Sequence, residues 1–457
     1  MTLPKTPKSP ALIQLLRWIF TPMSFMEECY KRYGDIFRLQ LSREIVIVSN
    51  PQALGQILAG DTKDFEAPGD LNSLFEHSLG KKSLIMLSGA SHQRQRQLMM
   101  PSFHGERIRN YGDTIANITK QIMSQWEIGK PFCVRSSTQT ITMRTIVEAV
   151  FGVYEGDRAQ KLEQLFSEML ERTSSPLTVA MLYFPALRNI FGSLNPWQQF
   201  LRIRREIDDI LYQEIRECRE NPDPSRTDVL SLLVAARDEA GQPMTDEELR
   251  DELMTLLFAG HETTATALAW ALYWIHKIPT VREKLLEELD SLGENPDYTT
   301  IFKLPYLNAV YCETLRIYPV GILTFPRRAK VPLSLAGYDI QPGAVLMGSI
   351  YLTHRREDIY PEPEKFKPER FLERQYSPYE FLPFGGGARR CIGFAFAQFE
   401  MKIALVEILS RLELELIDNG EVQSKRRGLV SAPNRSIQMV VKGERKMKSR
   451  TLEAVSG

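Results

Sequence analysis

A single cysteine, Cys391, stands between a glycine- and arginine-rich stretch and an alanine-containing, helix-like segment. Glycine residues let a backbone turn sharply and approach a ligand closely. A cysteine at the start of a helix, next to cations, has its thiolate form favoured over the thiol. The stretch could therefore hold a sulfur as a ligand of a metal ion.

Three interpretations compete for this stretch. A lone cysteine is most often a buried structural residue beside a turn. A phosphate-binding glycine loop does not fit, because Arg390 stands where G-x-G-x-x-G needs its last glycine and no Lys-Ser/Thr follows. The third is a haem-thiolate loop, and the pattern F-G-x-G-x-R-x-C-x-G resembles the haem-binding signature of the cytochromes P-450. Its members are Phe384, Gly385, Gly387, Arg389, Cys391 and Gly393.

A second motif lies in a predicted helix from Asp246 to Lys277. Thr245 and Glu248 form a capping box, and Pro279 follows the end of the run. The middle, residues 259–264, reads Ala-Gly-His-Glu-Thr-Thr. Glycine and threonine weaken a helix, and threonine can bond back to an i−4 carbonyl, so we expect a widened turn here. A chance polar cluster is the alternative, but the stretch resembles the family's oxygen-activation motif.

The resemblance implies how the cofactor is held. His92 and Arg96 share a helix face at i and i+4, which alone would suit a solvated basic surface. In the family the corresponding residues contact the haem propionates, and the bidentate geometry of arginine suits carboxylates. Arg327 and Arg389 match further propionate ligands, while Arg390 is expected at the proximal surface. The expected cofactor-binding residues are His92, Arg96, Arg327, Phe384, Arg389 and Gly393, with Cys391 on the iron.

A structural role is expected for three charged residues. Glu313 and Arg316 lie at i and i+3, a spacing that alone is weak evidence for a functional pair. Together with Arg370 they occur in the order that the family requires. The resemblance implies a buried charge cluster, in which removal of one partner would strand a charge.

These motifs need a large scaffold, and the chain has 457 residues. Alternating apolar residues predict a β-hairpin at 35–49, helical patterns dominate the next 250 residues, and strand-like segments follow at 321–350 and 412–441, the latter with a turn at Asn419-Gly420. This is mainly α with a minor β region, as in the cytochrome P-450 fold. We expect an N-terminal segment (1–34), a single domain (35–441) and a C-terminal tail (442–457).

The composition excludes several classes of protein. Basic and acidic residues balance at 57 each, which gives no indication of nucleic-acid binding. Five scattered cysteines do not form a disulfide framework and suit a reducing cytoplasm. The apolar segment 11–20 is interrupted by Gln14 and Arg17, so we expect no membrane anchor and a helix packed on the protein's own surface.

The resemblance implies a haem-thiolate monooxygenase that inserts one oxygen atom of O2 into a C–H bond. Heme b would be the cofactor, with electrons from NAD(P)H through a ferredoxin or flavodoxin and its reductase. Glu262 is expected to relay protons and Thr263 to direct them to oxygen. A haem-thiolate isomerase or dehydratase usually lacks this acid–alcohol pair, and a non-catalytic haem sensor or carrier would show no turnover.

The residues expected to line the substrate site are apolar, which favours a fatty acid, a terpenoid or a steroid-like molecule. Residues 83–103 resemble cyanobacterial hydroxylases of fatty acids and terpenoids. The lining residues expected from the family pattern are Ile85, Met86, Ala259, Val320, Ile322, Leu323, Leu429 and Val430.

Overall fold

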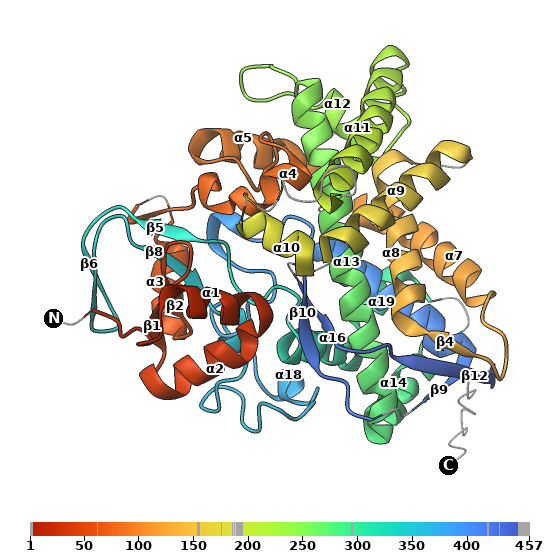
Figure 1. The fold of residues 1–457 in the computed structure, drawn as a ribbon. Helices are drawn as coiled ribbons and strands as arrows, with labels where there is room; N and C mark the ends of the chain where they lie inside the picture. The colour runs from red at the N-terminus through yellow and green to blue at the C-terminus, as the bar shows by residue number, and fades with distance from the viewer. Residues whose placement is uncertain are drawn as a thin grey trace.

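A computed structural model of the chain describes residues 3–61, 63–103, 105, 107–152, 156–174, 176–184, 186, 188, 195–293, 296–417, 420–428 and 430–446. Helices dominate this part of the chain and surround a central helix, α13 (Asp246–Lys277), which Figure 1 shows in green. The expected mainly helical architecture with small sheets is confirmed.

The remaining helices follow the chain from the N-terminus to the segment after Cys391. They are α1 (Ala11–Phe20), α2 (Pro22–Tyr33), α3 (Pro51–Ala59), α4 (Glu76–Leu79), α5 (Gly89–Met99), α6 (Arg107–Asn110), α7 (Gly112–Met123), α8 (Val134–Phe151), α9 (Asp157–Ser174), α10 (Pro176–Tyr183), α11 (Pro196–Glu220), α12 (Val229–Ala235), α14 (Pro279–Asp290), α15 (Tyr298–Lys303), α16 (Pro305–Ile317), α17 (Ile350–Thr353), α18 (Arg370–Glu373) and α19 (Phe394–Arg411).

The largest sheet joins both ends of the sequence. The predicted hairpin is present as β1 (Ile36–Gln40) and β2 (Glu44–Val48), paired antiparallel. β2 then pairs in parallel with β8 (Val345–Gly348), which continues through β5 (Arg327–Ala329) to β3 (Phe65–Glu66). β6 (Leu333–Leu335) and β7 (Tyr338–Ile340) form a hairpin beside it.

The second β region lies at the opposite end of the molecule (Figure 1). β12 (Gln438–Glu444) pairs with β4 (Pro131–Cys133) and β9 (Leu412–Leu416). The strand ends at Glu444, three residues beyond the domain boundary expected at 441. β10 (Ser424–Arg427) and β11 (Val430–Pro433) form a separate hairpin. The turn predicted at Asn419-Gly420 lies partly outside the described residues.

The capping box predicted for α13 is present. The Thr245 hydroxyl accepts a hydrogen bond from the Glu248 backbone N–H at 3.2 Å, and Glu248 accepts one from the Thr245 N–H at 2.8 Å. The expectation of a widened turn at 259–264 is wrong, because the α-helix runs unbroken. A Cβ on Gly260 would lie 2.9 Å from Cδ1 of Ile146 in α8. Close packing of two helices therefore explains this glycine.

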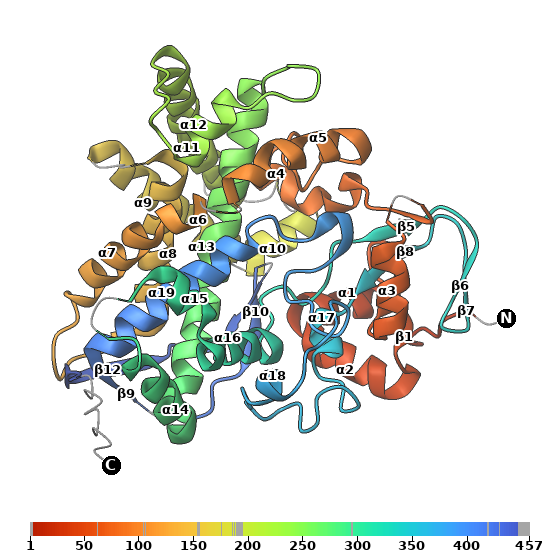
Figure 2. The same cartoon turned by 180° about the vertical axis from the view of Figure 1, so that it is seen from behind.

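The polar middle of α13 separates two hydrophobic cores. Its first half contributes Leu249, Leu253 and Leu257 to one cluster, and its second half contributes Leu268 and Trp270 to the other. α19 lies beside α13 in both views and also contributes to both clusters (Figures 1 and 2). Residues 259–264 are therefore placed where helix packing leaves room for a ligand.

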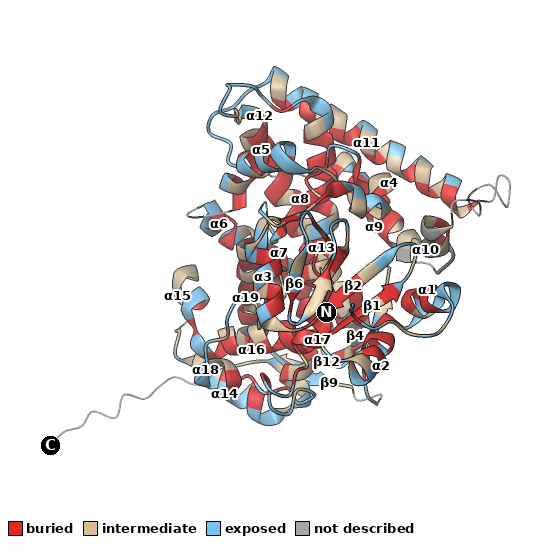
Figure 3. Cartoon of the chain, turned by 90° about the vertical axis from the view of Figure 1, so that its left-hand side faces the viewer, coloured by how far each residue is buried: buried red, intermediate tan, exposed pale blue. Residues whose placement is uncertain are grey.

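The N-terminal helices pack against the larger sheet. Trp18 of α1 and Phe25 of α2 belong to one cluster with Phe37 of β1. The outer side of α1 is exposed in Figure 3, with Leu12 at 60% and Phe20 at 57% of full exposure. α1 thus packs on the protein as expected, but only through one face. In the part of the chain that the structure describes, no helix is long and apolar enough to cross a bilayer.

Candidate active site

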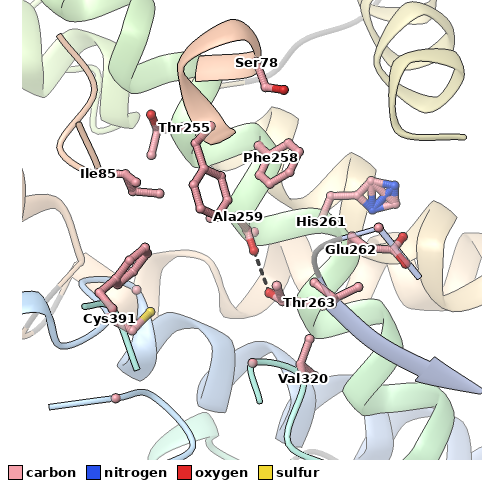
Figure 4. Close-up of a pocket in the computed structure, with 18 of the residues that line it drawn as sticks. Ser78, Ile85, Thr255, Phe258, Ala259, His261, Glu262, Thr263, Val320 and Cys391 are labelled. Carbon is pink, nitrogen blue, oxygen red and sulfur yellow. Dashed lines mark hydrogen bonds between the residues drawn. The ribbon is translucent and has the colours of Figure 1, made fainter. Parts of the chain in front are cut away.

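A cavity of about 1320 Å³ lies between α13 and the loop that precedes α19. Figure 4 shows Cys391 on one side of it and the turn from Ala259 to Thr263 on the other. Both chemical motifs expected from the sequence thus face one space, although they are more than a hundred residues apart in the chain.

Hydrogen bonds and glycines shape the cysteine loop. The Cys391 N–H donates to the Phe384 carbonyl at 3.0 Å, which closes the loop. Gly385 and Gly387 have φ of +66° and +63°, a region that side chains with a Cβ rarely adopt. A Cβ on Gly387 would also lie 2.1 Å from an oxygen of Asp61. Steric and conformational demands therefore explain the glycine spacing.

Cys391 lines the cavity and is exposed there, although protein atoms enclose its thiol on the other sides. Burial raises its pKa, while a backbone hydrogen bond from Gly393 and the charges of Arg96 and Arg390 lower it. A cation bound at the sulfur would add to the groups that favour the thiolate. The sulfur is thus placed as a metal ligand at the start of α19.

Basic side chains gather at one edge of the cavity. His92 and Arg96 line it from α5, and Arg389 joins them from the cysteine loop. Burial, together with the charges of Arg389, Arg96 and Arg327, lowers the pKa of His92 to about 3. Arg389 is buried and donates to the carbonyls of Leu84, at 2.7 Å, Ala67 and Leu87.

Arg327 has a carboxylate partner that the sequence did not indicate. It pairs with both oxygens of Asp61 and donates to the Gly386 carbonyl at 2.9 Å. Asp61 also accepts from the Ala388 N–H at 2.7 Å, so it ties Arg327 to the cysteine loop. Arg327 lies behind the cavity wall in this arrangement, whereas His92, Arg96, Phe384, Arg389 and Gly393 line the cavity.

These residues fit a haem. The positive charges of three arginines act on His92, and Asp61 is the carboxylate near these arginines. A cofactor that carries two carboxylates would therefore balance the excess positive charge. A Cβ built on Gly393 meets no atom within 4 Å, which leaves open space beside the sulfur for a flat macrocycle. The donor set and this open space suit an iron porphyrin held by one thiolate.

Comparison with known proteins agrees with this geometry. The family description "Cytochrome P450" matches residues 4–441. The chain belongs to the cytochrome P450 family. A Mycobacterium tuberculosis protein named "Putative cytochrome P450 135B1" is 34% identical, over 100% of this chain and 95% of its own. Another, "Putative cytochrome P450 135A1" from the same species, is 32% identical over 90% of this chain and 89% of its own.

Solved P450 structures share the fold. The cytochrome P450DA heme domain superposes with a TM-score of 0.86 at 23% identity, covering 98% of this chain and 99% of that one. A cyanobacterial P450 solved with retinoic acid, CYP120A1, gives a TM-score of 0.83 at 24% identity, covering 96% and 99% of the two chains. Family membership makes this protein a haem-thiolate monooxygenase that uses O2.

The side chains of the acid–alcohol pair, Glu262 and Thr263, point in different directions. The Thr263 hydroxyl donates to the Ala259 carbonyl at 2.6 Å and stays at the cavity (Figure 4). The Glu262 carboxylate accepts from Arg135 and, at 2.8 Å, from Gln139, both in α8. Figure 4 shows Glu262 pointing away from Cys391. Thr263 is thus the member of the pair that faces the cysteine side.

Most of the expected lining residues reach the cavity. Ile85, Ala259, Val320, Ile322, Leu323 and Val430 line it, whereas Met86 does not and Leu429 lies outside the described residues. The segment from Val320 to Pro326 is not a regular strand, and only an isolated bridge joins Leu323 to Ser349.

Three aromatic residues that the sequence did not single out add to the apolar wall. Phe75 packs edge-to-face on Phe258, with ring centroids 6.4 Å apart, and contacts Phe325 at 6.2 Å. They come from separate elements, so no local pattern brings them together.

The charge cluster of Glu313 has the expected partners. Its carboxylate accepts from Nε and Nη2 of Arg316 at 2.6 and 2.8 Å and from Nε of Arg370 at 3.2 Å. The Lys367 N–H adds a fourth hydrogen bond at 2.8 Å. All three charged side chains are buried and lie outside the cavity wall, which agrees with a structural role.

Proposed function

We propose that this P450 hydroxylates an apolar small molecule of the fatty-acid, terpenoid or steroid-like class. The observation that carries the proposal is the one cavity that joins Cys391, Thr263 and the aromatic wall of Phe75, Phe258 and Phe325. Such a wall contributes apolar contact area and few hydrogen bonds, which suits a hydrocarbon body. The overall reaction joins R–H, O2, two electrons and two protons to give R–OH and water.

The haem, ligated by Cys391, supplies the oxygen-activation chemistry when it is bound. His92, Arg96 and Arg389 would hold its carboxylates, with Arg327 supporting the loop from behind. Thr263 would hold the proton that is delivered on the cavity side. Glu262 would take protons from solvent, and release from Arg135 and Gln139 would let its carboxylate turn toward Thr263.

The two electrons would come from NAD(P)H through a ferredoxin or flavodoxin and its reductase. Arg390 supports this part of the proposal, because its side chain is exposed beside Cys391 and its guanidinium lies 4.2 Å from the ring centroid of Phe394. A cation at this position would attract an acidic electron-transfer protein.

Carbon monoxide binding to the reduced protein tests the thiolate ligand directly. The wild type should give the red-shifted Soret band typical of the family, and Cys391→Ser should lose this band while retaining haem. Persistence of the band in the variant would mean that another residue ligates the iron. Turnover with a surrogate ferredoxin and reductase under ¹⁸O2 should then place one labelled atom in the product.

A further inference from the structure

Besides the basic edge of His92, Arg96 and Arg389, the cavity wall has a second polar part. Side chains from α8 and α9 form this polar part, together with the end of β10. They include Ser136, Gln139, Thr140, Gln164 and Ser167. Two of them are already paired, Gln139 with Glu262 and Thr140 with the Ser136 carbonyl. The polar groups that remain suit a ligand with a polar end.

Arg427 is the last residue of β10 and lies in this polar part of the wall. Gly428, with φ of +59°, turns the chain back into β11, where Val430 pairs with Arg427. The hairpin therefore fixes the backbone of Arg427 at the cavity. A side chain that starts from a fixed strand loses less freedom when it binds a ligand.

No hydrogen bond or ion pair engages the Arg427 guanidinium within the described ranges, and its Nε is buried without a partner. Neighbouring arginines differ in this respect. Arg426 donates to the carbonyls of Gly428 and Trp18 at 2.8 and 2.9 Å. Arg135 is paired with Glu262. Arg427 thus has unused donors, and a guanidinium remains charged at neutral pH.

The nearby carboxylates do not pair with the free donors of Arg427. The Glu262 carboxylate is already taken by Arg135 and Gln139. Glu171 attracts Arg427 electrostatically but lies beyond ion-pair distance on the exposed part of α9. A half-buried guanidinium without a close anion is costly, and a bidentate carboxylate would remove that cost.

We propose that Arg427 binds the carboxylate of the substrate, which is therefore an apolar molecule with one ionised acid end. The inference rests on the proposed function and narrows its substrate class to carboxylic acids. The charge of Glu262 acts on Arg427, and Glu262 points away from Cys391 in Figure 4. Because Arg427 and Cys391 line one cavity, an acid held at Arg427 would extend its apolar body through that cavity toward Cys391, and oxidation would occur away from the carboxylate.

Equilibrium dialysis of the haem-loaded protein with labelled ligands tests the inference without using the haem spectrum. The probes are matched acids and alcohols, namely retinoic acid with retinol and the C12–C18 fatty acids with their alcohols. The wild type should bind at least one acid about tenfold more tightly than its alcohol. Arg427→Gln should weaken that acid about 10- to 100-fold and leave the alcohol unchanged, as expected for a charged hydrogen bond. Arg427→Lys should retain part of the preference.

Arg43→Gln is the matched control, because Arg43 also lines the cavity but is exposed, whereas Arg427 is partly buried. It removes the same charge and should leave the acid preference intact. The inference is overturned if no acid binds more tightly than its alcohol in the wild type, or if Arg427→Gln weakens acid and alcohol equally. A missing thiolate band with carbon monoxide would instead overturn the proposed function.

Discussion

Removing the Glu313 carboxylate should destabilise the whole protein. Glu313 and Arg316 are both 0% exposed, and the carboxylate accepts four hydrogen bonds from Arg316, Arg370 and the Lys367 backbone. Breaking a buried pair from one side costs about 3–5 kcal/mol. In Glu313→Ala, Arg316 would still donate to the His354 carbonyl at 2.8 Å and Arg370 to the Pro361 carbonyl at 3.1 Å. The loss of stability should therefore lie near the lower end of this range.

The melting temperature, measured at one scan rate, reports this loss. A change of 1 kcal/mol shifts the melting temperature by about 2–4 °C in a chain of 150–250 residues and by less in a longer one. We therefore expect Glu313→Ala to melt about 5 °C below the wild type and to yield less haem-loaded protein. Salt should change this difference little, because buried charges are poorly screened.

Glu127→Ala is the matched control for this experiment. Glu127 pairs with Lys130 at 2.5 Å, but both side chains are more than half exposed. Exposed ion pairs contribute little to stability, so this variant should have the same melting temperature as the wild type. If Glu313→Ala also had the melting temperature of the wild type, the cluster would not hold the fold together.

Two further predictions concern α13. Thr263→Ala should keep substrate affinity and NAD(P)H consumption but release more hydrogen peroxide per product, because the hydroxyl at the cavity is lost. Thr264→Ala should remain coupled, since the Thr264 hydroxyl faces the buried Glu400 carboxyl, and equal uncoupling would contradict this assignment. Burial raises the pKa of Glu252 from 4.5 to about 8. The unfolded chain therefore releases this proton first, and stability falls as the pH rises from 4.5 to 8. Glu252→Gln should raise the melting temperature increasingly across that range, whereas a pH-independent difference would show an ionised carboxylate in the folded protein.

Elements with local signals were predictable from the sequence. The capping box at Thr245 and the proline at 279 locate both ends of α13, and alternation locates the β1–β2 hairpin. The order of the motifs along the sequence predicted the charge cluster of Glu313, Arg316 and Arg370. The continuity of α13 at Gly260 was missed, because the deciding contact comes from Ile146 in another helix.

Long-range contacts in the site were not predictable in the same way. Asp61 and Arg327 are separated by 266 residues, and neither has a local pattern that indicates the other. Burial and free hydrogen-bond donors likewise distinguish Arg427 from Arg426, although the two are adjacent in the sequence. Such distinctions depend on which partners the folded backbone brings within reach.

The largest sheet has a consequence for biosynthesis. β2 is complete at residue 48, but its parallel partner β8 begins at residue 345. At about 5–20 residues per second, a ribosome needs on the order of 15–60 s to make the intervening chain. During that time the β-branched edge of β2 (Ile45-Val46-Ile47-Val48) has no strand to pair with, and open edges of this kind join other chains. High-yield expression should therefore depend on chaperones that cover this strand until β8 has been synthesised.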